Sequence, residues 1–510
     1  MGTLANAQQL LGIRRGIEKE SLRALPGGSL ALTPHPEKLG AALTHPRITT
    51  DFSESQIELI TGVHASPEDA VRELTEIHQA VYHVLAKEGD ERLWVSSMPC
   101  GLPTDETIPL GRYGNSNIGR TKSIYRMGLG QRYGRRMQTI SGIHYNWSLP
   151  GVTSAEYFGL IRNFRRHSFL LLYLFGASPA LCSSFVAGRS HELLPLSHQP
   201  GNGNGVHSFH MPHGTSLRMG RLGYQSDAQS LLAVSYNNLD SYAASLQGAL
   251  TMPYLPYEAI GVRNPGGDYN QLSTSLLQIE NEFYGTIRPK RVIRSGERPL
   301  HALRERGVEY VEVRCMDLDP FEPVGISEQT MRFLDVFLLH CLYTDSPPDT
   351  PEEIAALARN QHRTAARGRE KDLRLEVGSK TRTLTEWGGE LLDQCEPYAA
   401  ALDAAHGGTA YHDALLDAKA TLADPERCPS ARVLAAMAEG FGNSHVRFIQ
   451  ARSEATREHI MSEPFAAALA MQHKDQARES LNAQAQIEAA DTMDFEEFRQ
   501  RYIAPDALKV

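Results

Sequence analysis

The sequence predicts an α+β protein whose C-terminal third is mainly helical. Over residues 12–343, short segments that alternate apolar and polar residues are mixed with helical segments and separated by glycine-rich turns. After the breaker run SPPDTPEE at 346–353, the chain becomes rich in Ala, Glu, Arg and Leu and poor in strand-forming residues. We therefore expect an α+β core over residues 1–345 and a helical region over 346–510 that packs on it.

Length and composition are those of a large globular protein. The 510 residues are 41% hydrophobic and 22% charged, which is enough to bury a large core. At about 150 residues per domain, the length fits either three domains or one unit built around a wide sheet. The net charge of -9 gives no general attraction to nucleic acid or to an anionic membrane, so we expect small-molecule partners.

Cysteine usage and the apolar segments favour a cytoplasmic protein. The six cysteines form no CxxC pair and are too few for a disulfide scaffold, which fits a reducing compartment. The N-terminal residues lack the apolar core of an export signal. The most apolar stretch, at 169–188, is interrupted by Pro179 and several serines, so it predicts a buried helix rather than a membrane span.

Two predicted strands carry charged residues on a single face. The segment GIEKESLR alternates apolar and polar positions, which places Glu18 and Glu20 on the same face of a strand. In VEYVEVR, Glu312 and Arg314 share a face for the same reason. Both strands therefore offer pairs of ionisable side chains to one side of a sheet.

Acidic residues recur inside otherwise apolar segments, and solvated faces would explain only some of them. Carboxylates together with one imidazole are the ligands suited to Mg²⁺ or Mn²⁺ rather than to zinc. His144, in QTISGIHYN, could be that imidazole, and a hydrogen-bonded core histidine is the alternative interpretation. The acidic residues in question are Glu18, Glu20, Asp51, Glu54, Glu58, Glu280, Glu282 and Glu312.

Three segments look like known motifs but favour simpler interpretations. GNSNIGRT has the spacing of a P-loop, yet Arg120 stands in place of the lysine and no apolar strand precedes it. The GNGNG run has no βαβ context, so it predicts a loop. His207, His210 and His213 could ligate a transition metal, but Pro212 argues against a regular helix and an exposed polar loop is favoured.

Taken together, the segments resemble the proteobacterial type of glutamate–cysteine ligase, also called γ-glutamylcysteine synthetase. The resemblance is dense over the first two thirds of the chain and sparse after that. It rests, in order, on GIEKESLR, ALTHPRITTDFSESQIELIT, GDERLWVSSMPC, YGNSNIGRTKSIYRMGLGQRYG, MQTISGIHYN, LFGASPALCSSF, TSLRMGRLGY, LQIENEFYGTIRPKRVIRSGE, VEYVEVRCMDLDPFEPVG and QIEAAD.

This resemblance implies a reaction and a fold. The reaction is the ATP-dependent ligation of the L-glutamate γ-carboxylate to the L-cysteine amine through γ-glutamyl phosphate, the first step of glutathione biosynthesis. Mg²⁺, or alternatively Mn²⁺, would be the cofactor, ATP and the two amino acids the partners, and the protein a monomer. The implied fold is a curved antiparallel sheet that forms a funnel flanked by helices, akin to glutamine synthetase and the guanidino kinases.

The resemblance also implies roles for individual residues. Arg314 matches an arginine near the transferred phosphoryl group, with Glu312 beside it as a second catalytic residue. Apart from the resemblance, the basic stretch of Arg288, Lys290, Arg291 and Arg294 is a candidate for contacts to nucleotide phosphates, with Arg288 and Lys290 as the chosen residues, and an ordinary solvated turn is equally compatible with it. The implied metal ligands are Glu18, Glu20, Asp51, Glu58, His144 and Glu312, and the implied cysteine pocket is Phe52, Tyr125, Leu129, Gln138, Arg218, Tyr224 and Tyr284.

Two alternatives come from different functional classes. A ligase of the same fold could couple glutamate to an amine other than cysteine, which ADP release with different amines would reveal. A catalytically silent protein could bind ATP or glutamate as a sensor, and any dipeptide product would exclude it. The complete acidic set argues against the sensor, and the matching pocket residues argue against a different amine.

Overall fold

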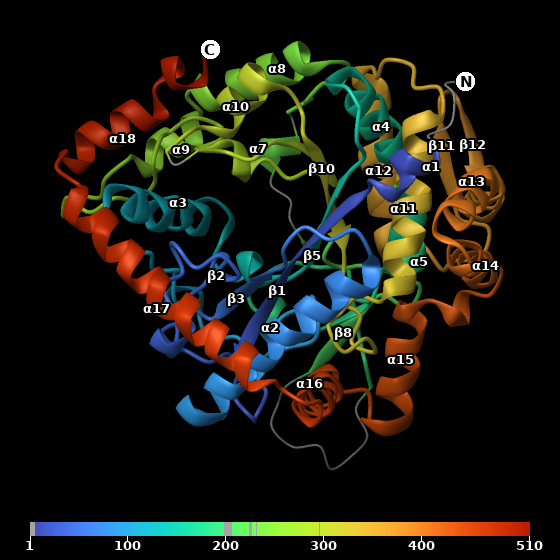
Figure 1. Ribbon diagram of the computed structural model, residues 1–510, viewed down its shortest axis with the longest axis horizontal. Helices are drawn as coiled ribbons and strands as arrows, with labels where there is room; N and C mark the ends of the chain where they lie inside the picture. Colours follow the sequence, from blue (N-terminus) through green and yellow to red (C-terminus); the bar gives the residue numbers. More distant parts are fainter. Residues whose placement is uncertain (1–5, 198–206, 224–226, 231, 295, 510) are drawn as a thin grey trace.

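A seven-stranded antiparallel sheet forms the centre of the protein (Figure 1). The computed structural model describes residues 6–197, 207–223, 227–230, 232–294 and 296–509. Six strands follow the order β2-β3-β1-β5-β10-β9, and β4 pairs with β1. Strand β5 therefore lies between β1, from the start of the α+β core, and β10, from its end. The strands are β1 (Arg14–Ala24), β2 (Ile48–Thr50), β3 (Gln56–Ile60), β4 (Arg92–Leu93), β5 (Ile143–Ser148), β9 (Ile287–Lys290) and β10 (Tyr310–Met316).

Alternation along the strands separates an apolar face from a polar one. Ile17 of β1 is the register partner of Tyr145 of β5, which in turn is the partner of Val313 of β10. All three are fully buried in the main hydrophobic core. The adjacent residues along each strand, such as Glu18 on β1 and His144 on β5, point to the opposite face of the sheet. The two strand predictions made from the alternating segments are confirmed.

Helices cover the apolar face of the sheet. Core residues of α2 (Pro67–Glu88), α4 (Ser154–His167), α5 (Phe169–Phe175) and α11 (Glu328–Tyr343) join the same hydrophobic cluster as the strands. Leu74 and Ile77 of α2 and Leu334 of α11 illustrate this packing, since each is almost completely buried. Ser66 caps α2 by accepting a hydrogen bond from the Asp69 amide, which fixes where this helix begins.

The remaining elements surround the central sheet and the helices that cover its apolar face. Two smaller sheets contain β6 (Ala180–Cys182), β7 (Leu194–Pro195) and β8 (Ser208–His210), and β11 (Arg374–Val377) with β12 (Lys380–Thr383). The other helices of the first part are α1 (Ala7–Leu11), α3 (Asn117–Tyr133), α6 (Ser183–Val186), α7 (Asp227–Ser230), α8 (Leu239–Thr251), α9 (Leu255–Ile260) and α10 (Pro299–Arg306).

The C-terminal third runs round the rim of the molecule, from α13 on one side through α16 to α17 and α18 on the other (Figure 1). Its helices are α12 (Pro351–Arg367), α13 (Leu384–His406), α14 (Ala410–Ala423), α15 (Pro429–Gly440), α16 (His445–Ser462), α17 (Ala467–Ala490) and α18 (Phe495–Ile503). They contact the first part at several places: α14 packs on α11, α16 on α2, and α18 on α3.

Two details differ from the sequence predictions. The stretch at 169–188 is buried, but α5 covers only its first part, because the chain turns at Gly176 and continues into β6 and α6. A Cβ at Gly176 would lie 2.5 Å from the Leu172 carbonyl oxygen. The helical region also contains the hairpin β11–β12, whose turn uses Gly378 at a φ of 58°.

No helix among the described residues is long and apolar enough to cross a membrane.

A buried ion pair joins β1 to α11. Arg15 donates through Nε and Nη2 to one carboxylate oxygen of Asp335, at 2.8 and 2.6 Å, and the Tyr145 hydroxyl donates to the other at 2.8 Å. Both charged side chains are fully buried. Removing one partner would leave an uncompensated charge in the core.

We therefore expect Asp335→Ala to lower the free energy of unfolding by about 3–5 kcal/mol, because Arg15 would lose its carboxylate. The matched control is Asp475→Ala, which removes the carboxylate of the exposed Arg478–Asp475 pair and should cost less than about 1 kcal/mol. Urea unfolding followed by circular dichroism measures both. Equal effects for the two variants would contradict a structural role for the Arg15–Asp335 pair.

Candidate active site

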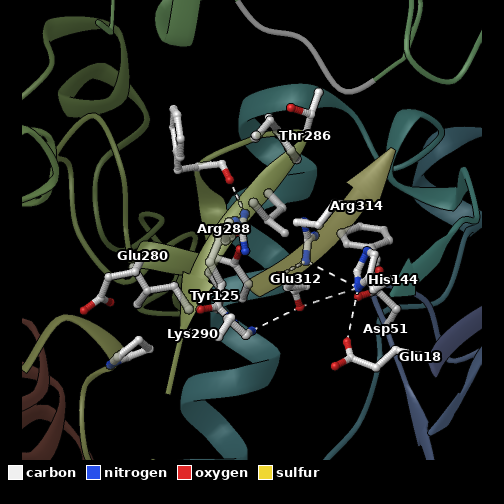
Figure 2. A pocket seen from close by; sticks show the side chains of 18 of the residues that line it. Glu18, Asp51, Tyr125, His144, Glu280, Thr286, Arg288, Lys290, Glu312 and Arg314 are labelled. Carbon is white, nitrogen blue, oxygen red and sulfur yellow. Dashed lines mark hydrogen bonds and ion pairs between the residues drawn. The ribbon is translucent and has the colours of Figure 1, made fainter. Parts of the chain in front are cut away.

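The polar face of the central sheet borders a cavity of about 1150 Å³. Strands β1, β3, β5, β9 and β10 contribute side chains to one side of it, and α3 contributes to another. The catalytic residues, metal ligands and cysteine-pocket residues implied by the resemblance all line this cavity, except Tyr224, which lies outside the described residues, and Arg288 and Lys290 line it as well. Segments spread over some 300 positions of the chain are thus brought together around one space (Figure 2).

Strand register explains how the candidate metal ligands meet. Glu18 of β1 lies opposite His144 of β5, and Glu20 lies opposite Glu58 of β3. Glu312 of β10 lies opposite Asn146, two residues after His144 and therefore on the same face. The sixth candidate, Asp51, follows the end of β2 and also lines the cavity.

His144 is at the centre of this group. Its Nδ1 atom lies 3.1 Å from Glu18 Oε2 and 3.8 Å from Glu312 Oε1, and its Nε2 atom lies 3.8 Å from Glu20 Oε1. One potential ligand atom each from Glu18, His144 and Glu312 fall within 4.8 Å of one another, which is close enough to share a cation. Figure 2 shows these side chains pointing toward one another.

Two cations flank the acidic group on the side of Glu312. Arg314 Nη1 donates to Glu312 Oε2 at 2.9 Å, and Lys290 Nζ lies 3.1 Å from Glu312 Oε1. Arg288 on β9 is buried and donates to the main-chain oxygens of Asn281 and Phe283. Its guanidinium therefore holds the neighbouring loop while it lines the cavity.

Burial and crowding of like charges set the pKa values of these groups. Burial, reinforced by Asp51, raises the pKa of Glu20 to about 8. Burial also raises the pKa of Glu58, and Glu18 and Asp51 add to the effect. For Glu312, burial acts in the same direction, but Lys290 and Arg314 outweigh it and hold its pKa well below the usual range.

The pKa of His144 is lowered, first by burial and then by Arg314. The imidazole is consequently in its neutral form around neutral pH, which is the form that can ligate a metal.

The predicted acceptor pocket is largely apolar. Phe52, Leu129, Tyr125 and Tyr284 belong to one hydrophobic cluster next to the acidic group. The Gln138 side-chain amide donates to the Tyr284 hydroxyl at 2.8 Å, which fixes the orientation of the tyrosine ring. Arg218, also predicted from the sequence, contributes a buried guanidinium to the same cavity.

Three other acidic residues in the sequence-derived set have structural partners. Glu54 accepts hydrogen bonds from the main-chain amides of His35 and Arg112. Glu280 pairs with Arg298 at 2.6 Å, and Glu282 pairs with Arg132 at 2.8 Å. These carboxylates stabilise loops around the cavity.

The motif-like segments have structural explanations as well. The GNSNIGRT segment leads into α3, whose first amide, that of Asn117, donates to the Asp491 carboxylate from the end of α17. A protein carboxylate thus occupies the position where a P-loop would bind phosphate. His210 lies on β8, with Nδ1 3.1 Å from the Leu194 main-chain oxygen. The GNGNG run lies outside the described residues.

The structure adds residues that the sequence did not single out. Asn146 donates to Glu18 Oε1 at 3.0 Å, and its place two residues after His144 on a strand could have indicated this. Lys122 and Arg126 both line the cavity from α3, and their spacing of four places them on one face of that helix. Gly142 touches two site residues, a contact that no local pattern reveals.

The cavity holds a buried set of carboxylates and one histidine beside fixed arginine and lysine side chains. This arrangement is suited to an enzyme that acts on phosphorylated substrates. Comparisons with known proteins narrow this class. The family model described as glutamate-cysteine ligase matches residues 2–364.

Individual relatives agree with the family model. The chain is 46% identical to a glutamate–cysteine ligase of Alcanivorax borkumensis, covering 97% of this chain and 96% of that protein. It is also 46% identical to one from Azotobacter vinelandii, covering 99% and 97%. The chain belongs to the glutamate–cysteine ligase family, which confirms the resemblance drawn from its sequence segments.

Solved structures support the same relationship. The crystal structure of the Francisella tularensis glutamate–cysteine ligase in complex with AMP superposes with a TM-score of 0.90 at 36% identity, covering 97% of this chain and 98% of that one. A bifunctional glutathione synthetase from Pasteurella multocida gives a TM-score of 0.65 at 25% identity, covering 98% of this chain and 57% of that one. The mixed architecture of antiparallel sheet and many helices is therefore that of the family.

Proposed function

We propose that this protein ligates the γ-carboxylate of L-glutamate to the amine of L-cysteine at the expense of ATP, giving γ-glutamylcysteine, ADP and phosphate. This reaction is the first step of glutathione biosynthesis. The observation that carries the proposal is the set of carboxylates around His144, with Arg314 beside it, on the cavity face of the sheet. Family membership and the nucleotide-bound relative support it.

The chemistry explains why the site needs both acids and cations. A carboxylate is a poor electrophile, so amide formation needs prior activation, and transfer of the ATP γ-phosphoryl group to glutamate makes an acyl phosphate. Bringing a triphosphate against another carboxylate is electrostatically unfavourable unless positive charge lies between them. Arg314, on β10 and facing the cavity, can donate to the phosphoryl oxygens as charge redistributes during transfer.

The acidic group fits divalent cations of the magnesium type. We assign Glu18, Glu20, Asp51, Glu58, His144 and Glu312 as the residues that would hold them. Oxygen ligands with one imidazole match Mg²⁺ or Mn²⁺, and bound cations would relieve the crowding of buried carboxylates. When bound, such ions neutralise phosphate charge and orient the reacting oxygens.

Lys290 and Arg288 are the proposed nucleotide contacts on β9. Lys290 is the better placed of the two, because its ammonium faces Glu312 across the cavity-lining strand pair. Arg288 is tied to two main-chain oxygens, so its contribution would be mainly electrostatic.

The apolar pocket accounts for the choice of acceptor. Phe52, Leu129, Tyr125 and Tyr284 offer a surface suited to a small thiol side chain, with Tyr224 as a further proposed contact. Arg218 would bind the α-carboxylate of cysteine. Excluding water from this pocket would also protect the acyl phosphate from hydrolysis.

The wider organisation follows from the same proposal. The central sheet with its cavity would form the funnel shared with glutamine synthetase and the guanidino kinases. Residues 1–345 would be the catalytic core, and 346–510 a helical region packed on it as part of one catalytic unit. We propose a monomer that works in the cytoplasm, where the six buried free cysteines would remain reduced.

Incubation of the purified protein with ATP, Mg²⁺, glutamate and cysteine should yield γ-glutamylcysteine, identified by mass, with one ADP per peptide bond. The same incubation without cysteine is the control and should release far less ADP. ATP hydrolysis without any dipeptide, under conditions in which the protein is folded, would refute the proposed function.

Replacing Glu18 or Glu58 with glutamine should lower kcat by on the order of a hundredfold, because each change removes a metal-ligand charge. In metal-free protein, loss of the Glu58 carboxylate should leave the unfolding temperature at or above the wild-type value, because burial and the neighbouring carboxylates raise the pKa of Glu58 and disfavour its charge. Saturating Mg²⁺ should raise the unfolding temperature of the wild type more than that of either variant, because at about 100 times Kd a ligand adds about 2.7 kcal/mol of stability.

The matched control is Glu479→Gln, which removes the same charge from an exposed position on α17. It should leave kcat and the response to Mg²⁺ unchanged. Wild-type behaviour of both cavity variants would contradict the assignment of the acidic group as the metal site.

Glutamate labelled with ¹⁸O in its side-chain carboxylate should deliver one labelled oxygen to each phosphate released, since the acyl phosphate loses that oxygen when the amine attacks. Mass spectrometry of the phosphate measures this transfer. Label appearing in AMP would mean adenylation instead. Unlabelled phosphate under product-forming conditions would exclude the acyl-phosphate route and the role given to Arg314.

A further inference from the structure

Arg218 is held in one orientation by groups at the end of β10 and by its neighbour Met219. Its guanidinium is 2% exposed, although it lines the cavity. Nη2 donates to the main-chain oxygen of Arg314 at 2.8 Å, and Nη1 lies 3.3 Å from the Met219 sulfur and 3.9 Å from Asp317 Oδ1. The strand that carries the proposed phosphoryl contact therefore also supports Arg218.

Asp317, which directly follows β10, is itself immobilised. The Ala177 amide and the Ser178 hydroxyl donate to its Oδ2 atom at 3.0 and 2.6 Å, and the Ser216 hydroxyl donates to Oδ1 at 3.0 Å. The carboxylate is buried, and its ion-pair partner is Arg218. A fixed buried anion of this kind orients a nearby guanidinium because it favours one placement of the positive charge.

Gly142 supplies the remaining side of this arrangement. A Cβ at this position would lie 2.1 Å from Nη2, 2.3 Å from Cζ and 2.5 Å from Nε of Arg218. The guanidinium thus packs directly against the main chain at 142, which only glycine permits. The blocked atoms are the end of a flexible side chain, so a methyl group here would displace the guanidinium rather than the backbone.

Gly142 also contacts a proposed metal ligand. Its amide donates to Glu20 Oε2 at 2.8 Å, and its carbonyl oxygen accepts from the Glu20 amide at 3.0 Å. Arg218 and Glu20 therefore meet through one residue. Both contacts with Glu20 use main-chain atoms of Gly142, which an alanine at this position would keep.

We propose that Asp317 and Gly142 are positioning residues that hold Arg218 as the clamp for the acceptor's α-carboxylate, and so make the enzyme select amines that carry this carboxylate. The inference rests on the proposed function, within which Arg218 binds that carboxylate. Bidentate binding requires a guanidinium with a fixed plane, and a displaced arginine loses the paired geometry. Asp317 fixes the charge, and Gly142 provides the space.

A purely structural role is the alternative for Asp317, since its hydrogen bonds also join residues 177 and 178 to Ser216. The two roles differ in what they change. Loss of a structural tie would impair every acceptor equally, whereas misplacement of Arg218 would impair only acceptors that have a carboxylate. Cysteamine, which is cysteine without its carboxylate, is therefore the diagnostic substrate.

The experiment compares wild type, Asp317→Asn and Gly142→Ala with cysteine and with cysteamine as acceptors. Asp317→Asn keeps a side chain of the same shape but removes its charge, while Gly142→Ala leaves Asp317 intact. Each variant should raise KM for cysteine roughly 10- to 100-fold, as expected for a misplaced binding group, with kcat within a few-fold of wild type. The kcat/KM for cysteamine and the KM values for ATP and glutamate should not change.

Gly389→Ala is the matched control, because it adds the same methyl group to a helical glycine with open space around it. It should leave all constants unchanged. Thermal unfolding identifies any variant that is not folded, and if Asp317→Asn fails to fold, Gly142→Ala decides the question alone.

The outcomes distinguish failure of the roles given to Asp317 and Gly142 from failure of the proposed ligase activity. A drop of at least about tenfold in the preference for cysteine over cysteamine, in the variants relative to wild type, supports the positioning roles. An unchanged preference in the variants, or equal losses with cysteine and cysteamine, overturns the positioning roles. They are also overturned if the wild type makes γ-glutamylcysteine but does not discriminate between cysteine and cysteamine. A wild type that forms no γ-glutamylcysteine refutes the proposed function itself.

Discussion

The structure depends on keeping several carboxylates side by side on one buried face of a sheet. Isolated buried charges are strongly unfavourable, and like charges in contact are more so. The antiparallel register places Glu18 opposite His144 and Glu20 opposite Glu58. The rigid backbone of the paired strands therefore sets the spacing between these side chains. Arg314 and Lys290 offset part of the negative charge at Glu312.

The apolar face of the same sheet makes this arrangement possible. Ile17, Tyr145 and Val313 alternate with the charged residues and pack into the main core, so the strands cannot slip by one residue without exposing the core side chains. Packing energy from one face thus holds the electrostatically unfavourable face in place. The buried Arg15–Asp335 pair adds a connection from β1 to the helices behind it.

Sequence reasoning recovered what depends on local pattern and on family motifs. The alternation in GIEKESLR and VEYVEVR predicted β1 and β10 and the shared faces of their charged residues, and the helical C-terminal third was correct apart from one hairpin. Strand order was beyond reach, because it depends on pairing between segments far apart in the chain. For the same reason the contacts of Gly142 and Asp317 with Arg218 appeared only in three dimensions.

The closure of the rim by the C-terminal helices has a consequence for biosynthesis. The Asp491 carboxylate accepts a hydrogen bond from the first amide of α3, and the Tyr502 main-chain oxygen accepts one from Arg298. The sheet that contains β1 is complete only when β5 and β10 have also been synthesised. At about 5–20 residues per second, roughly 15 s to a minute separates the emergence of β1 from that of β10 on the ribosome. During this interval the acidic face lacks Glu312 and Arg314, and the cavity is completed only later in synthesis, because Ile487 of α17 and Tyr502 of α18 also line it.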